Sequence, residues 1–172
     1  MTKKYFSPKI SIVQIEDLSL ICSSSKVRKP AEINVPQSSA NNSVYSSLSQ
    51  QQKMAAMGLM TVFGGSCSGT PQDIDKINHI MTVEGGKMGV SGAQVHAAYN
   101  TFSGMHDMVN TLKGVNRSAL ESLFWAYYCI VAVGKSAQAV QVLLGVYKDL
   151  GVSEQECISI LENRTGKRAG NL

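Results

Sequence analysis

The chain has 172 residues, a length typical of one domain. Charged residues make up only 16% of it, against about 25% in an average globular protein. The net charge of +4 is not gathered into a basic block, and no apolar run approaches the roughly 20 residues that span a bilayer. We therefore expect no nucleic-acid partner and no membrane span.

The four cysteines are widely spaced along the chain and form no CxxC pair. Scattered single cysteines are typical of reduced thiols in an intracellular protein. Lys9, Glu16 and Asp17 interrupt the segment that would have to be the apolar core of a signal peptide. These features predict a cytoplasmic location.

Residues 1–48 differ in composition from the rest, since all 15 glycines lie at Gly58 or later. Residues 9–16 alternate apolar and polar side chains at several positions, which predicts a short strand or an extended arm. The following Ser, Asn, Gln and Pro residues are typical of a flexible linker. We predict an N-terminal arm and linker over 1–48, either a disordered tail or a docking arm, and a basic tail over 164–172.

Helix signals begin at Ser49, which can cap an apolar helix. The glycines Gly64 and Gly65 predict a break after that helix. Thr70 then supplies a cap, and Pro71 occupies the first position of a second helix. The apolar face of this second helix is predicted from Ile74, Ile77, Ile80 and Met81.

A third helix is predicted from a capping box, in which Ser91 caps and Gln94 reaches back. Val109 and Leu112 indicate a short fourth helix that ends just before Gly114.

Asn116 is the predicted start of a long apolar helix that ends at a second glycine break, Gly134. The last helix begins at the cap Ser153. Between them, an apolar face at helical spacing is formed by Val140, Leu143, Leu144, Tyr147 and Leu150.

Two segments carry the same signals in the same order. Residues 151–157 match residues 89–95 in a glycine stop, a valine, a serine cap and its partner three residues later. Each match follows an apolar helix, a glycine-containing break and a second helix. We therefore predict an all-α, pseudo-symmetric bundle of six or seven helices over residues 49–163.

The repeated pattern resembles the tellurite-resistance TerB-like helical family. Residues 123–161, above all Leu150-Gly151-Val152-Ser153-Glu154-Gln155-Glu156, are similar to its C-terminal half, and residues 54–102 to its N-terminal half. The resemblance implies a TerB-like bundle that acts as a non-enzymatic interaction module with a protein partner, in membrane-associated or stress-response assemblies. The oligomeric state is left open.

The family carries an acidic turn that is implicated in cation binding, and this chain differs there. The corresponding residues 63–67 contain no acid, and Asp73 and Asp75 follow at the next helix start. Two residues at this spacing point about 200° apart on a helix, whereas a hard cation needs several converging oxygens. We predict no metal site and no cofactor. A divalent-metal-binding stress-response protein, with Asp73 and Asp75 as ligands, is the alternative.

Cys67 stands in a Gly/Ser-rich stretch, so the sequence predicts an exposed and reactive thiol. A Cys-dependent enzyme with Cys67 as nucleophile is a further alternative, but no catalytic motif accompanies it, and we expect no catalytic residue. Trp125 and Tyr128 lie in an apolar run and are core residues by default. Together with Cys67 they are the candidates for a partner or ligand surface.

Overall fold

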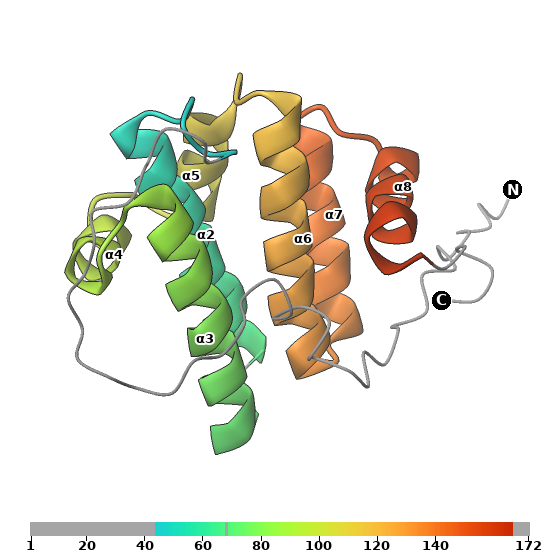
Figure 1. Cartoon of the computed structure of the whole chain (residues 1–172), viewed down its shortest axis with the longest axis horizontal. Coiled ribbons are helices and arrows are strands. Elements are labelled where there is room, and N and C mark those ends of the chain that lie inside the picture. The colour runs from blue at the N-terminus through green and yellow to red at the C-terminus, as the bar shows by residue number, and fades with distance from the viewer. Residues whose placement is uncertain (1–43, 68, 167–172) are drawn as a thin grey trace, which may run out of the picture.

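The computed structural model describes residues 44–67 and 69–166 (Figure 1). Within this part the chain is all-helical, which confirms the predicted fold class. The helices are α2 (Gln50–Cys67), α3 (Pro71–Met88), α4 (Gly92–Tyr99), α5 (Met105–Leu112), α6 (Arg117–Gly134), α7 (Ala137–Asp149) and α8 (Glu154–Thr165). The predicted strand 9–16 lies outside the described residues, as do residues 167–172 of the predicted tail.

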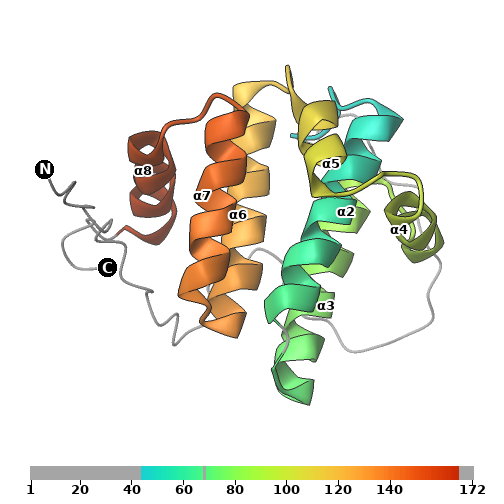
Figure 2. The ribbon, with the colours of Figure 1, turned by 180° about the vertical axis from the view of Figure 1, so that it is seen from behind.

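The helices form two groups, with α2 to α5 on one side and α6 to α8 on the other (Figures 1 and 2). The long helices α2 and α6, both of 18 residues, pack against each other where the groups meet. Helix α3 packs on α2 and also on α6, while α8 packs on α6 and α7. The order α2-α3-α4 thus corresponds to α6-α7-α8, as the internal repeat predicts.

The two glycine stops of the repeat adopt the same backbone conformation. Gly89 and Gly151 have φ angles of 68° and 79°, in the left-handed region that favours glycine. In each copy the next residue is a buried valine, Val90 or Val152, whose N–H donates to a carbonyl of the preceding helix at 2.9 Å. This bond satisfies a carbonyl that the helix end leaves unpaired.

The serine caps that follow are also equivalent. The N–H of Ser153 donates to Oε2 of Glu156 at 2.8 Å, and the N–H of Glu156 donates to the Ser153 hydroxyl at 3.3 Å. Ser91 and Gln94 make the same reciprocal pair, at 2.8 and 3.4 Å. Both predicted capping boxes are therefore confirmed.

The predicted break at Gly64 and Gly65 is wrong, because α2 continues through both glycines to Cys67. Gly64 is buried under α3, and a Cβ at this position would lie 2.9 Å from Cγ2 of Ile77. Because glycine has no side chain, α3 can pack closely on α2 at this position, and α2 continues past it. The predicted face of α3 is also narrower than expected, since Ile74 is 46% exposed.

The core extends a few residues beyond the predicted start of the bundle. Tyr45 and Leu48 are 1% and 5% exposed and belong to the hydrophobic core, although the sequence places them in the linker. At the other end, Arg164 belongs to α8, which is closed by Gly166 with a φ of 68°. No helix in the described part of the chain has the length and hydropathy to cross a membrane.

Candidate functional site

A groove lies between α2 and α7. It has a volume of about 310 Å³. One of its lining residues, Val142 of α7, is 39% exposed. The lining residues are Val62, Phe63, Ser66, Ser136, Gln138, Ala139 and Val142.

The groove arises from a difference between the two copies of the repeat. Helix α3 packs extensively on α6, whereas its counterpart α7 contacts α2 at few positions. The side of α2 next to α7 is therefore less covered than the side of α6 next to α3. The sequence repeat predicts two equivalent halves, and the groove is where they differ.

The seven described residues that line the groove are uncharged. Residues 54–67 of α2 and 137–147 of α7 contain no Asp, Glu, Lys or Arg. The hydroxyl of Ser66 donates to the carbonyl of Val62 at 2.8 Å, and the hydroxyl of Ser136 accepts the N–H of Ala139 at 3.1 Å. The groove thus offers apolar surface together with a similar amount of polar surface from hydroxyl, amide and backbone groups. The signal that the sequence carries for it is the uncharged stretch 137–147.

Cys67 is not in an exposed loop, contrary to prediction. It is the last residue of α2 and only 5% exposed, because Gly134 of α6 lies directly on it. Burial raises the pKa of the thiol, which disfavours the reactive thiolate. Its burial and raised pKa are thus typical of a structural cysteine.

Trp125 and Tyr128 stack on each other in α6, with ring centroids 6.2 Å apart and planes inclined by 23°. Tyr128 is 3% exposed, and only Trp125 is partly accessible. Cys67 contacts Gly134, nine residues beyond Trp125, or about 13 Å along the helix axis. The structure thus places Trp125 and Tyr128 next to each other and Cys67 away from them. Tyr128 is buried.

Asp73 serves as a capping residue. Its Oδ2 accepts the backbone N–H of Thr70 at 3.1 Å and the Thr70 hydroxyl at 2.8 Å, which completes a capping box at the start of α3. Asp75 is exposed two residues further along the helix. Within the described ranges, no group of three or more His, Cys, Asp and Glu side chains is placed to hold a metal ion.

Glu84 is a buried charged residue of α3. It is 8% exposed, accepts the Tyr45 hydroxyl at 2.6 Å and pairs with Lys87 at 2.6 Å. Burial, followed by the charge on Glu84, raises the pKa of Tyr45. Tyr45 and Glu84 are 39 positions apart, so no local pattern could have predicted the pair. The contact anchors the chain ahead of α2 to α3.

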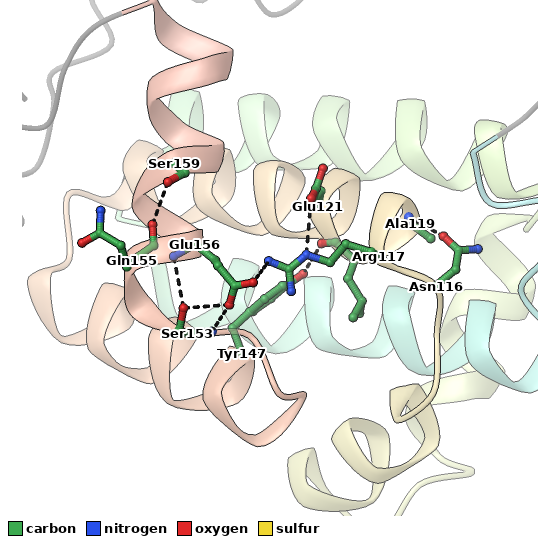
Figure 3. A network of polar contacts seen from close by, with 10 residues as sticks. Asn116, Arg117, Ala119, Glu121, Tyr147, Ser153, Gln155, Glu156 and Ser159 are labelled. Carbon is green, nitrogen blue, oxygen red and sulfur yellow. Dashed lines mark hydrogen bonds and ion pairs between the residues drawn. The ribbon is translucent and has the colours of Figure 1, made fainter.

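A second polar network joins the starts of α6 and α8 (Figure 3). Nη2 of Arg117 lies 2.9 Å from Oε1 of Glu156, and Nε of Arg117 lies 3.3 Å from Oε1 of Glu121. Hydrogen bonds from Ser153, and then the Arg117 guanidinium, lower the pKa of Glu156. The cap of α8 is thus also its attachment to α6, and the network has a structural role.

Comparisons of the chain with protein-family models, with curated proteins and with solved structures gave no match. The groove between α2 and α7 and the TerB-like resemblance of the sequence are therefore the two grounds for a function.

Proposed function

We propose that this protein is a non-enzymatic interaction module of TerB-like type, which binds a protein partner in the groove between α2 and α7. The observation that carries the proposal is the groove itself, a concave surface of about 310 Å³ that is lined by uncharged residues, among them the exposed Val142. Its volume lies at the lower end of the range for ligand sites, about 300–1,000 Å³.

The lining defines the chemistry of the partner segment. An aliphatic side chain gains about 1.5–3 kcal/mol when it is fully buried, and Val62 and Val142 offer accessible surface for this. A charged side chain would lose hydration in the groove without gaining an ion pair. The partner segment is therefore an uncharged one with aliphatic side chains, such as the apolar face of a helix.

Two further points support a binding role. The buried Cys67, with its raised pKa, does not favour a thiol enzyme. The TerB-like resemblance implies a binding module in membrane-associated or stress-response assemblies, and the scattered cysteines favour the cytoplasm, so this is the cellular setting that we propose.

Site-specific photocrosslinking in native cells tests the proposal. A photoreactive residue at position 142 is compared with one at position 83, since Val142 and Val83 are both exposed valines on helices, at 39% and 42%. We expect a discrete protein adduct from position 142 and none from position 83. Equal adducts from the two positions, or none from position 142, would count against the proposed function.

A further inference from the structure

We infer that the N-terminal arm regulates this groove, because residues 10–15 of the same chain bind in it and must leave before a partner docks. The inference rests on the proposed function, since it names what controls access to the same groove. It is carried by the composition of residues 10–15, by the length of chain between them and the bundle, and by the small volume of the groove. Residues 10–15 lie outside the described part of the chain, and their sequence provides the chemistry.

Residues 10–15 match the uncharged lining of the groove. The run Ile-Ser-Ile-Val-Gln-Ile contains no charge and four aliphatic side chains, and Lys9 and Glu16 flank it. All four aliphatic side chains are β-branched and stiff, so they lose little rotamer freedom on burial. The seven described lining residues are uncharged, so the flanking charges gain no ion pair from them and stay in water. The charges at positions 9 and 16 thus limit the segment that enters the groove to residues 10–15.

The length of the linker matches the distance that it has to span. The described part of the chain begins at Val44, just ahead of the start of α2 at Gln50. The groove residues Val62 and Ser66 lie 12 and 16 positions after Gln50, or about 18–24 Å along the helix axis. A flexible chain as long as residues 17–43 has a root-mean-square span of about 26–31 Å. The groove is therefore within reach of the arm.

The tether makes a small groove sufficient. With a volume of about 310 Å³ the groove holds only a few side chains, so we expect a Kd of about 1 mM for the free segment. The 2.6 Å hydrogen bond of Tyr45 to Glu84 holds the end of the linker on the bundle, which gives residues 10–15 an effective concentration of about 1 mM. The groove is then about half occupied, and the affinity for a partner falls about two-fold.

Photocrosslinking in the purified full chain tests the inference. A photoreactive residue at position 142 should form an adduct with residues 9–16 of the same chain, which proteolysis and mass spectrometry locate. The matched control is position 83 on α3, also an exposed valine, which should form none. The yield should stay constant on dilution from about 100 to about 1 μM, because a tethered reaction does not depend on protein concentration.

Two substitutions in the arm sharpen the test. Ile12→Asp places a charge within the run and should lower the adduct yield about five-fold or more. The matched control is Leu20→Asp, which makes the same change of charge outside residues 10–15 and should keep the wild-type yield. Both positions lie outside the described bundle, so neither change removes a described core residue.

The outcomes separate the inference from the proposed function. An arm adduct that is absent, maps elsewhere, falls on dilution, forms equally from position 83 or is lost equally in Leu20→Asp would overturn the inference. In native cells, Ile12→Asp should raise the yield of the partner adduct from position 142 about two-fold, and an unchanged yield would also overturn it. If the arm adduct is absent and the partner adduct persists, the proposed function stands. An arm adduct without any partner adduct contradicts the proposed function instead.

Discussion

Gly134 ends α6 directly on Cys67, the last residue of α2, with no space for a side chain at position 134. A Cβ there would lie 2.8 Å from Cα of Cys67 and would overlap its Cβ and carbonyl oxygen. The next residue, Lys135, adopts a left-handed conformation with a φ of 51°, and the chain then turns into α7. The contact thus joins the ends of two equivalent helices beside the groove.

Gly134→Ala should therefore destabilise the protein by about 1–3 kcal/mol, the usual cost of overpacking, because the clash is with backbone atoms. Urea unfolding measures the effect. Gly86→Ala on α3 is the matched control, since no atom lies within 4 Å of a Cβ at that position. It should be neutral, or should stabilise by up to about 1 kcal/mol through helix propensity. Equal effects of the two changes would show that the close contact is not formed.

The two serine caps should differ slightly in their contribution to stability. Ser91→Ala should cost about 1 kcal/mol, the usual value for an N-cap. Ser153→Ala should cost as much or more, because Ser153 also positions Glu156 for its ion pair with Arg117. Denaturant unfolding of both variants is the measurement. If either change leaves stability unaltered, that cap is not formed and the repeat loses its main support.

The position of Tyr45 predicts where the chain can be shortened. Deletion of residues 1–43 should leave a cooperative thermal transition. Deletion of residues 1–48 should lower stability by about 3 kcal/mol or more, because it removes the buried Tyr45 and Leu48 side chains. Circular dichroism melts distinguish the two fragments. Tyr45→Phe isolates the hydrogen bond to Glu84 and should cost about 1–3 kcal/mol. Identical melts for both deletions would place Tyr45 outside the core.

The buried thiols and phenols predict a loss of stability at alkaline pH. Burial raises the pKa of Cys129 to about 12 and that of Cys157 to about 11, and it also raises the pKa values of the Tyr127 and Tyr147 hydroxyls. The folded state retains these protons, whereas the unfolded state releases them above about pH 9 to 10. Stability should therefore be complete below about pH 8.5 and should fall as the pH rises.

Urea unfolding between pH 7 and about pH 10.5 checks this dependence. Cys129→Ala should reduce the slope, because it removes a group that ionises only in the unfolded state over this range. A stability that stays constant from pH 7 to about pH 10 would contradict the burial of these groups.

Divalent cations should bind weakly or not at all. Oδ2 of Asp73 is already an acceptor in the cap of α3, and Asp75 points to a different side of the helix. Calorimetric titration with calcium, magnesium and zinc should show no saturable binding tighter than about 100 μM, or about −5.5 kcal/mol. A tighter site that disappears in Asp75→Asn would instead favour the metal-binding alternative.

The helix starts could be read from the sequence because their interactions are local. Thr70, Ser91, Asn116 and Ser153 each cap through bonds to a residue three positions on, and the structure forms all four. The left-handed stops at Gly89 and Gly151 are equally local, since glycine adopts this conformation at little cost. These signals were sufficient for the all-α class and for the repeat.

The burial of several residues depends instead on contacts between helices, which the sequence does not show. Gly64 was predicted to break α2, but it lies inside the helix because Ile77 of α3 occupies the space above it. Cys67 was predicted to be exposed, but α6 covers it through Gly134. The pair of Tyr45 and Glu84 joins segments far apart in the chain. In each case, side-chain burial is a property of two or more elements together, and no local pattern encodes it.

The groove between α2 and α7 depends both on the sequence and on tertiary packing. The sequence specifies its chemistry, since the absence of charge from residues 54–67 and 137–147 is visible in the residue order. Tertiary packing decides that these stretches face a common hollow, because α3 lies closely on α6 whereas α7 stays largely clear of α2. The difference between two halves with the same helix order arises from the packing of helices against each other, and local hydrogen bonding does not determine it.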